Sequence, residues 1–485
     1  MKKELLILII CRILQILISL LSLRIMTSLF STEQMGEYYI FLTLFMLATL
    51  SVINPFGQYI NRNTYKWRSI GVLIPWMKKY IGFMILFSFL FSFAYLLWAQ
   101  VTTGELRFTP AIFCFLYITI ISANQFLLHT LNILNSRVSF SILTVLTAFL
   151  SLCFAYCLFQ LSILGLSSKV YSWLLGIIIA NFISFYVAFF LLNKNENKNE
   201  NENINENINV KEIINFCIPI AVTTFLMWVI SAGYRFGIEP LMGLTYLGIV
   251  AVCFSISSQV MSVIESLVTQ IFQPNLFKTM DEVSRPERSK LLEKYVNENI
   301  SIYFSALIFS SFFMHNIFLV LVDSQYFPYF HIGIIAIFSE FFRVSANSLA
   351  MYFFCEKDMK RGIIPFLCGA ILIVMMFGIF NLYGIKEHLF IIIPLGIAFS
   401  NFICFLSCLV AIRKYGTFTF KFIFIIKRII IIIPAIILTI YIPFSNTLNL
   451  HYFVIICSVS FIYLFLFIIS LIIVKQSQNR EKYES

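Results

Sequence analysis

The sequence predicts an all-α, polytopic membrane protein with about fourteen transmembrane helices. Of its 485 residues, 60% are hydrophobic and only 12% are charged, whereas soluble domains carry roughly 25% charged residues. The charges lie in short clusters between apolar stretches of about 20 residues, the length that crosses a bilayer. Alternating strand patterns are absent, so helices rather than a closed barrel are expected to satisfy the backbone.

Successive apolar segments are each expected to form one span. The first follows Met1-Lys2-Lys3, but it is too long for a signal peptide and lacks a small-residue cleavage site, which indicates an uncleaved span. The thirteenth is short, and loss of the last pair would leave twelve spans. The expected spans are 5–29, 37–60, 80–102, 110–134, 139–161, 170–192, 213–234, 244–270, 299–322, 329–354, 362–383, 389–412, 429–445 and 451–474.

Basic residues are distributed unevenly among the connections. With the N-terminus inside, the inner segments hold 27 of the 34 Lys and Arg residues, and the outer connections hold four. Because basic loops stay in the cytoplasm, this bias predicts that both termini are cytoplasmic. The outer connections are all short, so no outer domain is expected to carry an active site.

Composition and motifs argue against several function classes. The net charge of +11 comes mostly from basic residues beside spans, where they face anionic lipid, so no nucleic-acid partner is expected. No phosphate-binding loop, dinucleotide fingerprint, HExxH motif or nucleophile elbow occurs, which argues against an enzyme and a cofactor. The 11 cysteines fall almost wholly within spans without a metal-ligand pattern, which favours packing roles.

A polar tract divides the chain. Residues 193–209 read NKNENKNENENINENIN, which cannot bury a core and indicates a flexible linker. Six expected spans precede it and six follow up to residue 412. We therefore expect an N-lobe (1–192), a cytoplasmic linker (193–212), a C-lobe (213–412) and a C-terminal helix pair with a tail (413–485).

The two lobes share a faint repeat. The segments from Arg24 to Phe41 and from Tyr234 to Val250 each contain an Arg, an acidic residue, Met-Gly and Tyr. Since six spans are an even number, both lobes keep the same orientation, which predicts a parallel pseudo-repeat.

Residues 284–297 show the pattern of a short amphipathic helix. Ser284 and Glu287 form a capping box. The segment's apolar stripe consists of Leu291, Leu292, Tyr295 and Val296. We expect this helix to lie on the inner membrane face.

Ionisable residues within spans are the main functional candidates, because a cation in mid-bilayer costs at least ~2.5–3.5 kcal/mol and usually faces a partner or water. Arg343 lies deepest, and Glu340, three residues earlier, is its expected partner. This pair either faces a water-filled cavity or is a structural ion pair. Arg12, Arg24 and Arg235 lie nearer the membrane faces, where snorkelling is the alternative.

Two further spans carry polar groups. Glu265 shares the eighth span with Gln259, where it either lines a cavity or forms an internal pair. In the fourth span Asn124, Gln125 and His129 fall near one face. They either line a pathway or form hydrogen bonds between helices.

With Arg24, Gly36-Glu37-Tyr38 and Asn54-Pro55, the first two spans resemble those of the Wzx-type polysaccharide flippases. These flippases belong to the MOP exporter superfamily, which also includes MATE-like transporters. The length, span number and two-lobe organisation extend the resemblance over the whole chain. The matching residues are Arg24, Gly36-Glu37-Tyr38, Asn54-Pro55, Gln58 and Arg62, echoed by Arg235, Gly243, Tyr246 and Gln273-Pro274-Asn275. The expected span number departs from many O-unit flippases, which have twelve, and matches lipid II flippases.

The resemblance implies alternating access through a central cavity in a bacterial cytoplasmic, or inner, membrane. Its substrate would be an undecaprenyl-diphosphate-linked repeat unit of O-antigen lipopolysaccharide or capsule, and its partners membrane lipids and other proteins of polysaccharide assembly. A cationic cavity for substrate would involve Arg12, Arg24, Arg235 and Arg343. Cavity-lining or ion-coupling positions would be Glu265, Glu340, Gln58, Asn124, Gln125 and His129.

Three rival functions remain. The intramembrane residues Arg343 and Glu340 argue against one of them, a purely structural membrane protein. An O-antigen polymerase would carry a large outer loop for glycosyl transfer, which the sequence lacks. A cation-coupled multidrug exporter of the same superfamily typically has an acidic residue in its first spans, whereas spans one to six contain no central Asp or Glu.

Overall fold

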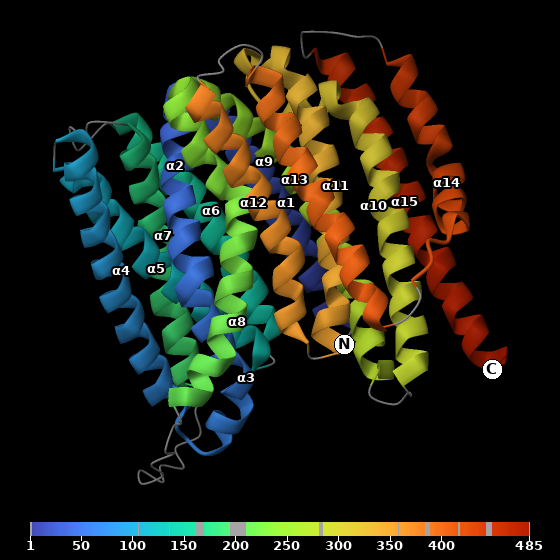
Figure 1. Ribbon diagram of the computed structural model, residues 1–485, viewed down its shortest axis with the longest axis horizontal. Coiled ribbons are helices and arrows are strands. Elements are labelled where there is room, and N and C mark those ends of the chain that lie inside the picture. Colours follow the sequence, from blue (N-terminus) through green and yellow to red (C-terminus); the bar gives the residue numbers. More distant parts are fainter. Residues whose placement is uncertain are drawn as a thin grey trace. The chain divides into compact units, whose positions relative to one another are not determined.

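The computed structural model describes residues 2–104, 106–134, 136–161, 169–194, 210–280, 285–356, 358–383, 389–415, 418–442 and 449–484. These residues are almost entirely helical, and no strand occurs among them. The described chain separates into two compact units, Met1–Phe236 and Gly237–Ser485. Figure 1 labels the helices of both units.

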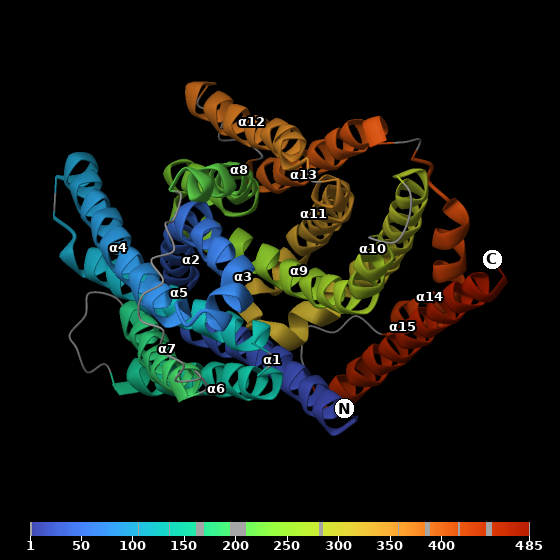
Figure 2. The ribbon, with the colours of Figure 1, turned by 90° about the horizontal axis from the view of Figure 1, so that it is seen from below.

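The first unit contains the helices up to the start of α9. Its long spans pack side by side, with α5 and α6 both against α7, and α1 against α6 (Figure 2). An aromatic cluster joins α6 and α7 to Phe30, the residue after α1: Phe30 contacts Phe159 and Trp173, and the Phe30 and Trp173 ring centroids are 5.7 Å apart. The elements are α1 (Lys2–Leu29), α2 (Thr32–Ala48), η1 (Thr49–Ile53), α3 (Asn54–Ser69), α4 (Leu73–Thr103), α5 (Phe108–Ile133), α6 (Arg137–Leu161), α7 (Lys169–Lys194), α8 (Val210–Trp228) and η2 (Val229–Gly233).

Two of these spans contain a π-helical turn. Elements η1 and η2 interrupt the second and seventh spans, and both turns lie where these spans pack together. Such wide turns free backbone carbonyls from regular helical bonding and concentrate at functional sites. Side chains of α8 bond to carbonyls of the second span: the Thr224 hydroxyl donates to the Leu50 carbonyl (2.7 Å) and the Trp228 indole to the Thr43 carbonyl (3.0 Å).

The second unit contains the remaining helices. Helix α13 packs against both α11 and α12, and α10 packs against α11 and α14 (Figure 2). The elements are α9 (Tyr234–Met280), which begins in the first unit, α10 (Arg285–Leu321), η3 (Ser324–Tyr329), α11 (Phe330–Cys355), α12 (Met359–Tyr383), α13 (Leu389–Ile412), η4 (Arg413–Tyr415), α14 (Phe422–Tyr441) and α15 (Leu450–Glu484).

The span count agrees with the predicted fold class. Twelve helical stretches of the described residues are long and apolar enough to cross a membrane. One of them, Lys211–Gln270, has 60 residues, which is about 90 Å of helix. Gly243 breaks it with φ of 79° and ψ of 174°, so it holds the predicted seventh and eighth spans. Helix α15 adds the shorter apolar stretch His451–Phe467, and every predicted span therefore has its helix.

The expected surface helix at 284–297 is not separate. Residues from Arg285 onward belong to α10, which continues without a break to Leu321; Ser284 lies outside the described residues. The predicted apolar stripe packs into the unit, since Leu292 and Val296 are fully buried and Tyr295 is 6% exposed. The prediction was wrong because an amphipathic stripe fits a protein core as well as a membrane surface.

Helices α14 and α15 pack on α10. Phe309 of α10 stacks on Tyr463 of α15 with ring centroids 3.7 Å apart, and the Tyr452 hydroxyl donates to the Asn316 side chain (2.8 Å). Helix α14 begins at Phe422, earlier than the predicted span at 429, and Arg428 is therefore buried in a helix rather than placed in an inner loop.

The lobe boundaries and the repeat stay predictions. Residues 195–209 of the expected linker lie outside the described residues, and helix α8, which follows them, belongs to the first compact unit. The two Met-Gly motifs differ locally: Gly36 lies inside α2, whereas Gly243 is the break between two spans.

Candidate functional site

A buried guanidinium lies where the second and seventh spans meet. Arg235, at the start of α9, is 8% exposed, and its Nη1 donates to the Thr43 hydroxyl of α2 (3.1 Å). Its Cζ lies 5.0 Å from the ring centroid of Tyr39 and 5.6 Å from that of Tyr234. Aromatic faces attract a cation through the ring quadrupole, but they leave its net charge uncompensated.

The local fold explains how this arginine becomes buried. The π-helical turn η2 ends at Gly233, directly before Tyr234 and Arg235, and turns this end of the span toward α2. The Trp228 indole bonds to the Thr43 carbonyl, while the Thr43 hydroxyl donates to the Tyr39 carbonyl (2.7 Å) and accepts from Arg235. Thr43 thus fixes both the packing of α8 and the guanidinium.

The Arg235 guanidinium keeps an unused donor. Its Nε is buried and has no hydrogen-bond partner, and no carboxylate pairs with this arginine in the part of the chain that the structure describes. Leaving a buried charged donor unsatisfied costs a few kcal/mol, so such a group is stable only if water or an anion completes it. The arrangement can therefore hold an anionic oxygen.

A second charged cluster forms within the other unit, between α9 and α11. Arg343 Nε lies 2.7 Å from Glu340 Oε2, and its Nη2 lies 3.7 Å from Glu265 Oε2. The Asn347 amide donates to Glu265 Oε1 (2.9 Å), and Arg343 Nη2 donates to Ser262 Oγ (3.5 Å). The predicted Arg343–Glu340 pair is present, and Glu265 joins it from the neighbouring helix.

The charge of this cluster differs from that at Arg235. One guanidinium faces two carboxylates whose side chains are 11% and 22% exposed, so the ionised cluster carries one net negative charge. It can hold a cation or proton more readily than a phosphate. The predicted contact of Arg343 with a wet central cavity stays a prediction.

The other predicted cations, Arg12 and Arg24, lie on the first helix. Arg12 is partly buried and donates from Nη1 to Gln15 Oε1 (2.9 Å) on the same helix. Arg24 is half-buried, and its Nη1 is a buried donor that has no hydrogen-bond partner among the described residues. Gln58 is exposed on α3. It follows Gly57, where the Tyr80 hydroxyl approaches the backbone so closely that a side chain would collide with it. Their roles in substrate binding stay predictions.

The predicted polar face of the fourth span divides in two. The Asn124 amide donates to Asn181 Oδ1 (2.9 Å), and Asn124 Oδ1 accepts from the Ser184 hydroxyl (2.9 Å), so this side chain joins α5 to α7. Gln125 and His129 point elsewhere and are exposed. Of the two alternatives for Asn124, interhelical hydrogen bonding is the one the structure contains.

A polar cluster between α10 and α14 was missed by the sequence analysis. Arg428 is 3% exposed on α14, and Glu298 is 1% exposed on α10. Nearby, the Asn297 side chain donates to the Thr419 carbonyl (3.0 Å) and accepts from the Lys421 amide (2.9 Å). The run Asn297-Glu298-Asn299 at the head of an apolar span was the available signal, because buried polar groups in a membrane require partners.

Comparison with known proteins identifies the fold. No known family profile matches the sequence, and no curated protein matches it. The lipid II flippase MurJ in an inward closed conformation aligns with a TM-score of 0.61 at 12% identity, over 99% of this chain and 100% of that chain. An inward-facing multidrug resistance MATE family transporter of the MOP superfamily aligns with a TM-score of 0.55 at 10% identity, over 83% and 94% of the chains.

These likenesses show that the chain has the fold of MOP superfamily transporters. With its apolar helices, it is a multi-pass membrane protein. The alignment with the flippase leaves out only 1% of this chain and therefore includes α14 and α15. The alignment with the MATE transporter covers less of this chain.

Proposed function

We propose that the protein is a flippase that moves undecaprenyl-diphosphate-linked oligosaccharide repeat units of O-antigen or capsule across the bacterial cytoplasmic membrane. The observation that carries the proposal is the buried Arg235 guanidinium with an unused Nε donor and no carboxylate partner within the described residues. The match to a lipid II flippase over nearly the whole chain, with the C-terminal helix pair, supports it.

The chemistry of the substrate requires such a group. A diphosphate headgroup cannot cross hydrocarbon bare, because the desolvation of its charge is prohibitive. A guanidinium replaces lost hydration with charge-assisted hydrogen bonds and stays protonated when partly dehydrated. Alternating access then exposes the bound headgroup to each side in turn, without a covalent step, so the protein needs no catalytic residues.

Among the predicted cations, we assign the headgroup contact to Arg235 ahead of Arg343. Two carboxylates already compensate Arg343, and a phosphate would have to displace them. Among the described residues, the Arg235 guanidinium is held by a neutral hydroxyl and two aromatic rings and by no carboxylate, so an anion adds to its contacts without competition. Arg24 also has a buried Nη1 that finds no hydrogen-bond partner in the described part of the chain, and it is a second headgroup candidate.

A second candidate function is a cation-coupled exporter of small molecules. The observation that favours it is the acidic cluster of Glu265 and Glu340 around Arg343, which can exchange a proton or a sodium ion. The same cluster would serve a flippase as its coupling site, so it does not by itself decide between the two functions.

The decisive experiment measures binding of undecaprenyl diphosphate to the purified protein in detergent, with undecaprenol as the uncharged probe. We expect wild type to prefer the diphosphate, and Arg235→Met to weaken its binding by about tenfold to a hundredfold, since a hydrogen bond to a charged group is lost. Arg235→Lys keeps the charge without the planar fork and should retain part of the affinity. Undecaprenol binding should not change.

Arg107→Met is the matched control, because Arg107 is exposed and at the end of a span. In cells, Arg235→Met should abolish surface polysaccharide at unchanged protein level, whereas Arg107→Met should not. Equal binding of undecaprenyl diphosphate by wild type and Arg235→Met would refute the role of Arg235. Efflux of cationic dyes that requires Glu265, together with normal polysaccharide in a deletion strain, would favour the exporter.

A further inference from the structure

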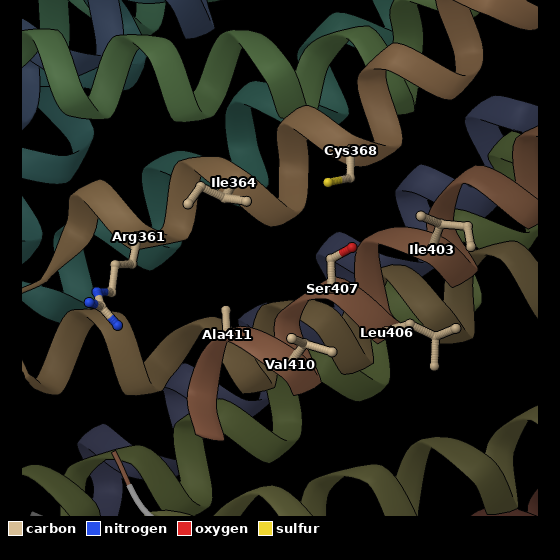
Figure 3. A pocket seen from close by; sticks show the side chains of 8 residues that line it. All are labelled: Arg361, Ile364, Cys368, Ile403, Leu406, Ser407, Val410 and Ala411. Atoms are coloured by element: carbon tan, nitrogen blue, oxygen red, sulfur yellow. The ribbon is translucent and has the colours of Figure 1, made fainter. Parts of the chain in front are cut away.

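A groove opens between α12 and α13 in the second unit. It has a volume of about 630 Å³, within the range of roughly 300–1,000 Å³ typical of ligand sites. Figure 3 shows Cys368 of α12 and Ser407 of α13 on its two walls and Arg361 at one end. Ile364, Leu406 and Val410 make most of the lining apolar.

The two helices are in close contact beyond the end of the groove that lies opposite Arg361. There the Ser400 hydroxyl donates to the Gly369 carbonyl (2.7 Å), and a methyl group at Gly396 would lie 2.0 Å from Met376 Sδ. Toward the other end the walls carry the small side chains of Cys368, Ser407 and Ala411, which do not fill the space between the helices.

The groove has most of the length of one membrane leaflet. On α12 the lining runs from Arg361 to Cys368, and on α13 from Ala411 back to Ile403, which corresponds to about 10–12 Å of helix. One half of the hydrocarbon core is about 15 Å thick. An acyl chain of one leaflet therefore fits along it, and a chain crossing both leaflets does not.

The open end carries positive charge. Lys360 precedes Arg361 on α12, Arg413 and Lys414 follow α13 shortly after Ala411, and all three are exposed. The Arg361 Nε is held by Asp358 Oδ2 at 3.0 Å, and the Tyr415 hydroxyl donates to the same carboxylate (2.9 Å). Because this pair uses Nε, the two terminal amino groups of Arg361 remain available to a phosphate.

We propose that this groove binds one anionic phospholipid, with an acyl chain between α12 and α13 and its phosphate on Arg361. The charge of the open end selects an anionic headgroup, since basic pockets between transmembrane helices bind such lipids. The apolar lining covers the chain, and the single-leaflet length excludes an occupant that spans the membrane. The inference does not depend on which substrate the protein transports.

Cys368 allows a test on the wild-type protein. Its thiol lines the groove, whereas Cys157 on α6 is exposed on the other unit and serves as the internal reference. Maleimide labelling of each cysteine is followed by peptide mass spectrometry in detergent with added dioleoyl phosphatidylglycerol or dioleoyl phosphatidylcholine. When the phosphatidylglycerol concentration is roughly ten times its dissociation constant, about a tenth of the grooves stay empty. Labelling of Cys368 should then slow about tenfold.

Variants separate the charge from the groove. Arg361→Gln should raise the phosphatidylglycerol concentration needed to protect Cys368 by about tenfold to a hundredfold, because a charge-assisted hydrogen bond is lost. Ala411→Trp should fill the groove and slow Cys368 labelling without lipid. Arg137→Gln, the same change at an exposed arginine of α6, should leave the protection unchanged.

Three results would overturn the proposal. Equal protection of Cys368 by phosphatidylcholine and phosphatidylglycerol would mean that the groove holds lipid chains without recognising a headgroup. Equal slowing of Cys157 would mean a general detergent effect. Stronger protection by undecaprenyl phosphate than by phosphatidylglycerol would assign the groove to an isoprenoid chain.

Discussion

Removal of the Arg343 guanidinium should destabilise the second unit far more than removal of a comparable arginine nearby. In Arg343→Gln the carboxylates of Glu340 and Glu265 lose the cation that lies 2.7 and 3.7 Å from them. At an effective dielectric constant of about 20, these contacts correspond to Coulomb energies of about 6 and 4 kcal/mol. Desolvation offsets part of this, and breaking a buried pair typically costs about 3–5 kcal/mol.

Arg361→Gln is the matched control. Arg361 also pairs through Nε with an acidic residue three positions earlier, at 3.0 Å, but the two side chains are 36% and 33% exposed. Exposed pairs contribute about 0–1 kcal/mol. We therefore expect Arg343→Gln to cost about 3 kcal/mol and Arg361→Gln less than about 1 kcal/mol.

The assay is SDS titration in mixed micelles, followed by far-ultraviolet circular dichroism, with no added anionic phospholipid; tryptophan fluorescence does not serve, because all five tryptophans lie in the first unit. The double variant Arg343→Gln/Glu340→Gln should recover part of the loss, because it removes one of the two carboxylates that the arginine separated. The reasoning is refuted if Arg343→Gln costs no more than Arg361→Gln, or if the double variant is as unstable as the sum of the single ones.

Three further predictions address the fold and the topology. Asn124→Ala should cost about 1–3 kcal/mol, because it removes two bonds to α7, whereas Ala at the exposed neighbour Gln125 should cost less than about 0.5 kcal/mol in the same titration. Gly243→Ala should cost about 1–3 kcal/mol from its positive φ alone, since a methyl group there meets nothing within 4 Å; Gly378→Ala, with equal space in a helix, should be neutral or stabilising. A reporter fused after Asn205 should be active only if it functions in the cytoplasm, and periplasmic activity would reverse the predicted topology.

The sequence determined the span architecture, because each span depends on neighbouring residues and on a fixed bilayer thickness. The same local character made the Arg343–Glu340 pair predictable, since residues three apart share a helical face. The local character of the sequence signal also explains the wrong prediction for 284–297. The apolar stripe showed that one helix face is buried, but not whether protein or lipid covers that face.

Contacts between helices were decided only by the tertiary structure. Glu265 joins Arg343 from another helix, Asn124 bonds Asn181 across 57 residues, and Thr43 holds Arg235 across 192. Inside a membrane, the faces that meet lipid and the faces that meet protein are both apolar, so hydrophobic periodicity does not reveal which helices touch. The partner of each intramembrane polar group, and therefore whether an arginine is neutralised or available to an anion, depends on packing that no local segment encodes.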